Sequence, residues 1–210
     1  MIVIVDYGMG NLRSVSKALE RLGAQACLTS RPEDVASAEK LILPGVGAFD
    51  AAMRELDARG LTEPIKTAIA ANRPYLGICL GLQLLFDSSE EGQGAPGLGI
   101  LRGTVRRLPA QADLKIPHMG WNQIDSVQQR ASSVQAHGRL LQGIPEGSFF
   151  YFVHSYYADP ADRSLVALES EYGLRFPAMI ARERLFATQF HPEKSQAVGL
   201  RLLKNFVELT

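Results

Sequence analysis

Short apolar runs alternate with amphipathic segments along roughly the first 80 residues of the chain. Runs of four or five apolar residues predict strands buried on both faces, and apolar residues spaced three or four apart predict helices. We expect strands at residues 2–5, 24–29, 40–43 and 74–78, and helices at residues 12–22, 49–58 and 65–71. Asn11 is predicted to cap the first helix. Strands that alternate with helices indicate an α/β fold with a mostly parallel central sheet flanked by helices.

The pattern changes from about residue 98, where strand-like runs follow one another at short spacing. We expect these strands at residues 100–108, 149–157, 165–170, 179–181 and 186–190, and a final amphipathic helix at residues 195–209. Strands without helices between them favour antiparallel pairing. The sequence contains no internal repeat and no low-complexity linker. We therefore predict a single domain over residues 1–210, with an additional antiparallel β region in its C-terminal half.

Composition and charge exclude several classes of protein. The 210 residues include 22 Lys and Arg and 22 Asp and Glu, so no overall charge attracts nucleic acid or an anionic membrane. The first residues lack the basic segment of a secretory signal. The longest nearly apolar run, residues 75–86, is shorter than the ~20 residues that span a bilayer. We therefore expect a cytoplasmic protein without a membrane segment.

Cys79 is the strongest candidate for a nucleophile. It stands between glycines at positions 77 and 81, after an apolar strand and before a predicted helical run at residues 82–86. A nucleophile elbow has this arrangement, because the two glycines allow a sharp turn that exposes the central side chain. The N-terminus of the following helix favours a thiolate at this position. The alternative is a buried structural cysteine, which is our interpretation of Cys27, since no such motif surrounds it.

A cysteine nucleophile needs a base, and His191 is the best placed of the four histidines. It follows a predicted strand, and Glu193 lies two positions further, where an extended chain points its side chain the same way. A nucleophile, a base and a carboxylate that orients the base would form a Cys79–His191–Glu193 triad. The alternative is a histidine at a strand end beside a solvated glutamate. We interpret His118 and His154 as structural histidines.

Two glycine-rich loops follow predicted strands. The loop at residues 44–47, Pro-Gly-Val-Gly, could bind an oxyanion through its backbone N–H groups together with that of Leu80, or it could be a tight turn. The loop at residues 8–10, Gly-Met-Gly, resembles a dinucleotide-binding loop, but Arg13 occupies the place of the third glycine. No Walker A motif and no cluster with zinc spacing occurs. We therefore expect no cofactor and no metal.

Two segments resemble the class I glutamine amidotransferases, which are glutaminases with a catalytic triad. They are Gly-Ile-Cys-Leu-Gly-Leu-Gln at residues 77–83 and His-Pro-Glu-Lys-Ser at residues 191–195. Three further segments, residues 6–11, 117–122 and 151–156, are more narrowly similar to the glutaminase subunits of imidazole glycerol phosphate synthases in histidine biosynthesis. The similarity extends from residue 2 to the last helix. It implies that the cysteine attacks the side-chain amide of glutamine, that a glutamyl thioester forms as ammonia leaves, and that water then releases glutamate.

The resemblance also implies roles for individual residues. Cys79 would be the nucleophile, His191 the general acid and base, and Glu193 the residue that orients the histidine. The oxyanion hole would consist of Val46, Gly47 and the N–H group of Leu80. The glutamine-binding residues would be Gln83, Glu91, Ser155 and Tyr156, and a slip of one residue would exchange Glu91 with Glu90.

A partner chain is implied as well. The glutaminase motifs already span residues 47–193, which leaves no room for a second domain that uses the ammonia. Ammonia in neutral water is mostly protonated, so it needs a sheltered passage to an acceptor site on another chain. The resemblance identifies this partner as a (β/α)8-barrel cyclase subunit, which converts a phosphorylated ribonucleotide to imidazole glycerol phosphate and an aminoimidazole carboxamide ribonucleotide. Asn11, Trp121 and Lys194 match interface positions of the family.

Three other functions remain open at the level of sequence. A cysteine hydrolase of the same architecture would act on peptides or small amides without a partner. A non-enzymatic subunit with a dead site would not react at Cys79 with an electrophilic glutamine analogue. Another amidotransferase, one of nucleotide or cofactor synthesis, is the nearest alternative, and the motif at residues 117–122 argues against it.

Overall fold

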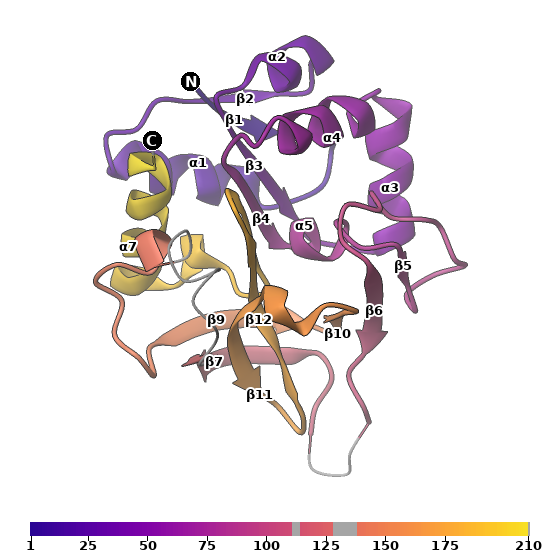
Figure 1. Cartoon of the computed structure of the whole chain (residues 1–210), viewed down its shortest axis with the longest axis vertical. Helices are drawn as coiled ribbons and strands as arrows, with labels where there is room; N and C mark the ends of the chain where they lie inside the picture. The colour runs from indigo at the N-terminus through magenta and orange to yellow at the C-terminus, as the bar shows by residue number, and fades with distance from the viewer. Residues whose placement is uncertain (111–113, 128–137, 210) are drawn as a thin grey trace.

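A mixed sheet forms the centre of the molecule (Figure 1). The computed structural model describes residues 1–110, 114–127 and 138–209, and within them this sheet has eight strands in the order β2-β1-β3-β4-β13-β12-β11-β8. Its strands are β1 (Ile2–Val5), β2 (Ala26–Thr29), β3 (Lys40–Gly45), β4 (Tyr75–Cys79), β8 (Asp125–Ser126), β11 (Val166–Glu171), β12 (Arg175–Arg182) and β13 (Leu185–Thr188). The helices are α1 (Leu12–Arg21), α2 (Pro32–Ser37), α3 (Phe49–Ala58), α4 (Thr62–Ala70), α5 (Leu80–Gln83) and α7 (Gln196–Glu208), with short 3₁₀ turns η1 (Arg163–Leu165) and η2 (Pro192–Lys194).

Two small sheets extend the structure beyond the central one. One has the order β10-β6-β5, with β5 (Ser88–Ser89), β6 (Gly103–Arg107) and β10 (Tyr156–Pro160). The other is an antiparallel pair of β7 (His118–Gln123) and β9 (Phe149–His154), which lies away from α2 and α4 in Figure 1. The α/β fold and the additional antiparallel strands agree with the prediction from the sequence.

The central sheet changes from parallel to antiparallel at β13. The strands β2, β1, β3, β4 and β13 pair in parallel, whereas β12, β11 and β8 continue the sheet in antiparallel pairs. The antiparallel pairing expected for the late strands is present between β12 and β13, but β13 also pairs in parallel with β4, which the sequence analysis did not predict. Its four residues are all buried and its register joins it directly to β4, so a strand from the second half of the chain becomes part of the parallel core.

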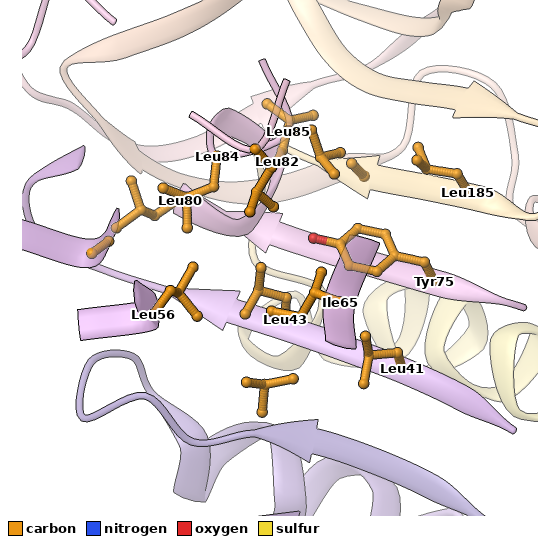
Figure 2. Close-up of a cluster of buried hydrophobic side chains, with 14 of the residues drawn as sticks. Leu41, Leu43, Leu56, Ile65, Tyr75, Leu80, Leu82, Leu84, Leu85 and Leu185 are labelled. Carbon is orange, nitrogen blue, oxygen red and sulfur yellow. The ribbon is translucent and has the colours of Figure 1, made fainter. Parts of the chain in front are cut away.

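Helices cover the central sheet on both faces, and each face has its own hydrophobic core. On one face, α2, α3 and α4 bury residues such as Val35, Leu56 and Ile65 against the strands. Figure 2 shows part of this core, in which Leu43 and Tyr75 of adjacent strands lie among leucines of α3 and of the segment after Cys79. On the other face, α1 and α7 form the second core, with residues such as Val15, Leu19, Leu202 and Phe206. A strand with helices on both sides must be apolar throughout, as the sequence pattern predicted.

Several boundaries differ from the prediction. The helical run expected at residues 82–86 is instead the four-residue helix α5 followed by a turn. The carbonyl groups of Leu84, Leu85 and Phe86 accept hydrogen bonds from N–H groups of residues 98–101, so they are not available to continue a helix. The side chain of Asn11 makes no capping hydrogen bond with α1. The sequence analysis also missed β7 and α2.

The four inner parallel strands end at the same edge of the sheet. The loops after β1 and β3 contain Gly8–Gly10 and Val46–Gly47, β4 ends at Cys79 directly before Leu80 of α5, and β13 leads into the segment 189–191. Ligands of open α/β sheets bind at the carboxyl ends of parallel strands. The topology therefore gathers the predicted catalytic and oxyanion residues at one edge.

Candidate active site

Cys79 occupies a strained turn between β4 and α5. It has a φ of 55° and a ψ of −105°, although it is not a glycine. The flanking glycines are required by close backbone contacts: a Cβ on Gly77 would lie 2.6 Å from the carbonyl oxygen of Gly81, and one on Gly81 would overlap the carbonyl oxygen of Leu43. The sharp strand–turn–helix geometry of a nucleophile elbow is therefore present, and backbone strain of this kind is concentrated at functional sites.

His191 and Glu193 form a buried pair behind the cysteine. Nδ1 of His191 lies 2.8 Å from Oε1 of Glu193, and both side chains are almost completely buried. The main chain of His191 is fixed on both sides, because its N–H donates to the carbonyl of Tyr151 at 2.9 Å and its carbonyl accepts from the Ser195 hydroxyl at 2.6 Å. With Nδ1–H directed at the carboxylate, Nε2 is left for the reaction.

The charge state of His191 is set by its neighbours. Burial by itself lowers its pKa, but the charge and hydrogen-bonding influence of Cys79 and the hydrogen bond and charge of Glu193 together raise the pKa to about 10. Nε2 of His191 makes no hydrogen bond of standard geometry with the described residues, yet it is close enough to Cys79 for a thiolate to stabilise the imidazolium. His191 is therefore suited to exist as an imidazolium beside the sulfur of Cys79 at neutral pH.

Unpaired buried polar atoms gather around this site. Within the described residues, four buried side-chain atoms lack a hydrogen-bond partner: Tyr7 Oη, Asp50 Oδ1, His191 Nε2 and Glu193 Oε2. A Cβ on Gly45, which pairs with Cys79 across the strands, would lie 2.5 Å from Oη of Tyr7, so the phenol lies beside the residue that precedes Val46 and Gly47. Burial and the charge of Cys79 raise the pKa of Tyr7 and keep it protonated. Buried polar atoms are nearly always paired elsewhere in proteins, so this cluster marks a functional region.

A cavity of about 390 Å³ opens above Cys79. It brings together every predicted oxyanion and glutamine-binding residue, namely Val46, Gly47, Leu80, Gln83, Glu91, Ser155 and Tyr156. Its wall also contains Lys194, Pro117, Val153 and His154. These residues come from loops, strands and helical turns between residues 46 and 194, so the fold brings together at one cavity residues that are far apart in the sequence.

The structure distinguishes the two adjacent glutamates. Glu91 lines the cavity, and its Oε2 accepts a hydrogen bond from the N–H of Phe49 at 2.9 Å at the start of α3. Burial raises the pKa of Glu91, an effect that the Phe49 N–H opposes and the charge of Asp50 reinforces. Glu90 instead accepts from the N–H of Arg107 at 2.9 Å on the exposed side of β6. The geometry therefore favours Glu91 over Glu90 as the glutamine-binding residue.

Two groups of residues near the nucleophile were missed or undervalued by sequence analysis. Gln189 is fully buried, and its Nε2 lies 3.6 Å from Sγ of Cys79. His118 and His154 are buried as expected, but they are bonded to each other, with His118 Nδ1 and His154 Nε2 2.9 Å apart. The ladder between β7 and β9 places the two histidines opposite each other. No local motif could reveal these contacts, since each joins residues distant in sequence.

The residues predicted at a partner interface lie at different depths. Lys194 lines the cavity, and its Nζ lies 5.7 Å from the centre of the Tyr151 ring. Trp121 lies beyond it on β7, 46% exposed, with its ring centre 6.1 Å from that of Tyr151. Asn11 precedes α1, a helix that contacts η2, the turn containing Lys194. Lys194 and Trp121 are thus connected through Tyr151, whereas the side chain of Asn11 makes no hydrogen bond with the described residues.

The described part of the chain has neither a cluster of metal ligands nor a helix that could span a membrane. It contains no group of three or more His, Cys, Asp and Glu side chains arranged to hold a metal ion. None of its helices combines the length and apolar character needed to cross a bilayer.

Comparison with known proteins identifies the family. The family model "Glutamine amidotransferase class-I" matches residues 3–209. A curated relative from Syntrophotalea carbinolica, "Imidazole glycerol phosphate synthase subunit HisH", is 52% identical, with 100% of both chains covered. A protein of the same name from Rhodopirellula baltica is 54% identical over 98% of this chain and 96% of its own.

Solved structures share the fold at much lower identity. A solved glutamine amidotransferase superposes with a TM-score of 0.73 at 19% identity, covering 99% of this chain and 97% of its own. PurLQS from Thermotoga maritima gives a TM-score of 0.71 at 17% identity, with 98% and 95% covered. The fold and the high identity to the curated relatives agree: the chain belongs to the class I glutamine amidotransferase family and, within it, to the family of HisH subunits of imidazole glycerol phosphate synthase.

Proposed function

We propose that this chain is the glutaminase subunit of an imidazole glycerol phosphate synthase, that it hydrolyses glutamine at Cys79, and that it supplies the ammonia to a cyclase subunit for histidine biosynthesis. Membership of the family supports the reaction and the pathway. The observation that carries the assignment of residues is the position of Cys79, which faces a cavity in front and the buried His191–Glu193 pair behind.

The geometry supports a thioester mechanism. Sγ of Cys79 attacks the amide carbon of glutamine, and the N–H groups of the 46–47 loop and of Leu80 stabilise the oxyanion. Nε2–H of His191 protonates the departing ammonia, leaving the glutamyl thioester. His191 then accepts a proton from water, which attacks the thioester and releases glutamate. Throughout this sequence Glu193 holds Nδ1–H and stabilises the imidazolium.

The cavity also provides charges for the substrate. The carboxylate of Glu91 is suited to the α-ammonium group of glutamine, and the backbone at Ser155 and Tyr156 to its α-carboxylate. The cavity volume of about 390 Å³ is large enough for an amino acid such as glutamine.

An exposed apolar surface on the β7–β9 pair supports a docked partner. Met119, Trp121 and Phe149 are 63%, 46% and 54% exposed, although large apolar side chains are usually buried. Trp121 and Phe149 also line a groove of about 370 Å³ together with residues 195–198 of the segment after η2. We propose that the (β/α)8-barrel cyclase subunit covers this surface, with Asn11, Trp121 and Lys194 at or near the interface. The central sheet contains strands from both halves of the chain, which supports a single domain over residues 1–210.

The assay that tests this function is glutamate release from glutamine. The purified chain would be measured alone and then with a HisF-type cyclase subunit and its nucleotide ligand, with Cys79→Ser as the blank. We expect strong stimulation by the partner, which the blank abolishes. Substantial hydrolysis of peptides or small amides without the partner would instead indicate a general hydrolase, and no release under any condition would contradict the proposal.

A further inference from the structure

A buried glutamine lies against the sulfur of the nucleophile. Gln189 is 0% exposed, and its Nε2 lies 3.6 Å from Sγ of Cys79. Its Oε1 accepts a hydrogen bond from Nε2 of Gln83 at 3.2 Å. The amide of Gln189 therefore directs its nitrogen to the sulfur and its oxygen away from it. An N–H group in this position favours negative charge on the sulfur and restrains the direction in which the sulfur points.

The orientation of this amide is determined by a backbone carbonyl. Nε2 of Gln83 also donates to the carbonyl oxygen of Tyr156 at 3.0 Å. A carbonyl can only accept, so the nitrogen and not the oxygen of Gln83 must face it. The same NH₂ group then meets Gln189, whose oxygen must be the acceptor, and the NH₂ of Gln189 is left for Cys79. Reversing either amide would place two acceptors or two donors in contact.

Two histidines extend the chain of hydrogen bonds to the β7 strand. Nδ1 of His154 lies 2.9 Å from the carbonyl of Tyr156, so Nδ1 carries a proton. In a neutral ring Nε2 then accepts from Nδ1 of His118 at 2.9 Å, and Nε2 of His118 accepts from the side-chain NH₂ of Asn122 at 3.3 Å. Burial lowers the pKa of His118 to about 4 and that of His154 to about 3, so both rings are neutral near pH 7. In each hydrogen bond from Asn122 through the two histidines to the Tyr156 carbonyl, only one of the two groups can therefore be the donor.

We propose that Gln189 is a further residue of the reaction centre, whose N–H group orients and stabilises the sulfur of Cys79, and that Asn122, His118 and His154 are positioning residues that hold the Tyr156 carbonyl and thereby the Gln83–Gln189 amides. The inference rests on the proposed glutaminase function, since Cys79 is the nucleophile of that reaction. Its direct consequence is that both histidines carry their proton on Nδ1, the less common tautomer of a free imidazole.

The first arm of the test replaces Gln189 with Met, which has a similar size and no N–H donor. The rate of Cys79 alkylation by iodoacetamide, followed by peptide mass spectrometry on the purified chain, is expected to fall by roughly tenfold, the lower end for a hydrogen bond to a charged group. In the complex with a cyclase subunit, kcat for glutamine should fall similarly with little change in KM. The matched control is Thr188→Val, because Thr188 is the residue next to Gln189, is equally buried at the end of β13, and donates its hydroxyl to the carbonyl of Phe190. An alkylation rate of Gln189→Met equal to that of this control would overturn the role of Gln189.

The second arm needs no glutamine, and its first measurement needs no variant. Long-range ¹H–¹⁵N correlation spectra of histidine-labelled wild-type chain report the tautomer of each ring, and we expect the Nδ1–H form for both His118 and His154. Finding the Nε2–H form or an imidazolium at either ring at pH 7 contradicts the network, whatever the enzymatic activity is.

Asn122→Asp replaces a hydrogen-bond donor by an acceptor and is expected to slow Cys79 alkylation more than Asn122→Ala does. Slower alkylation in Asn122→Ala than in Asn122→Asp would show that Asn122 acts through its size and not through its hydrogen bond to His118.

Discussion

The backbone at Cys79 has a conformation that residues with a Cβ rarely adopt, with φ at 55° and ψ at −105°. Such a conformation costs about 1–3 kcal/mol and persists only where surrounding contacts enforce it. Here the ladder pairs Cys79 with Gly45, and α5 begins at the next residue. The strained turn directs the sulfur of Cys79 toward the cavity and away from the hydrophobic core.

This strain predicts an unusual order of stability between two variants. Cys79→Gly relieves the backbone strain and Cys79→Ala does not, so the glycine variant should have the higher free energy of unfolding, by about 1 kcal/mol. At most buried positions alanine is the more stable of the two. Urea unfolding of both variants measures the difference. An alanine variant that is the more stable would show that the turn is not strained.

A second prediction at this scale concerns pH. Burial lowers the pKa of His191, but Cys79 and Glu193 raise it to about 10, above the ordinary value of 6.5. Between these two values the native chain binds more protons than the unfolded chain, so the stabilisation from His191 is complete below pH 6.5 and is lost as the pH rises toward 10. Glu193→Gln should reduce this loss. Urea unfolding at several pH values from 6.5 to 9.5 tests it, and identical slopes for the variant and the wild type would contradict the assignment.

The sequence predicted the residues whose signal is local and missed those whose signal is not. Cys79 has glycines two positions away on either side, and Glu193 follows His191 at the same spacing, so each can be recognised in a short window. Gln189 becomes significant only through a sulfur 110 positions away. The same holds for His118 and His154, which are 36 positions apart and meet because β7 and β9 pair. Their roles depend on tertiary structure.

At the scale of elements, the turn after β4 is determined by backbone packing. A Cβ on Gly77 would lie 2.6 Å from the carbonyl oxygen and 2.8 Å from the carbonyl carbon of Gly81, and neither can move without displacing α5. The strand β7 illustrates the opposite case. Exposed residues alternate in it with buried His118 and half-buried Gly120 and Asn122, so its inner face is not apolar enough to predict a strand from the sequence.

Gly77→Ala is therefore expected to damage both stability and activity. Overpacking against backbone typically costs about 1–3 kcal/mol, and the displaced turn should move Cys79 out of line with His191. The free energy of unfolding and the Cys79 alkylation rate measure the two effects. Gly138→Ala is the matched control, since a Cβ there meets nothing within 4 Å. Comparable values for the two variants would show that the elbow tolerates a side chain at position 77.

At the scale of the whole molecule, the parallel strands position the catalytic residues, and the β7–β9 pair covers the cavity. The carboxyl ends of β3, β4 and β13 bring the oxyanion loop, the nucleophile and the base to one edge. The β7–β9 pair covers the cavity with His154 and Val153 and exposes Trp121 on its outer surface. The parallel part of this arrangement could be predicted from the alternation of strands and helices. The entry of β13 into the parallel sheet could not, because its neighbour along the chain is the antiparallel β12.

The exposed apolar surface predicts where the partner binds. Trp121→Asp should weaken binding of a cyclase subunit by more than tenfold, because aromatic residues at the centre of an interface carry much of the binding energy. The free energy of unfolding of the isolated chain should change little, since Trp121 is 46% exposed. Leu28→Asp is the control, because Leu28 is equally exposed on the distant strand β2. Isothermal titration calorimetry compares the three chains, and an unchanged affinity for Trp121→Asp would place the interface elsewhere.

In the mechanism that we propose, Cys79 forms a glutamyl thioester with the help of His191. The most direct measurement is intact-mass spectrometry of the acid-quenched complex of this chain with a cyclase subunit during turnover of glutamine, followed by peptide mapping. We predict one covalent glutamyl adduct, located on Cys79 and absent from Cys79→Ser, with slower formation in His191→Asn. An adduct on another residue, or full glutaminase activity in Cys79→Ser, would contradict the mechanism.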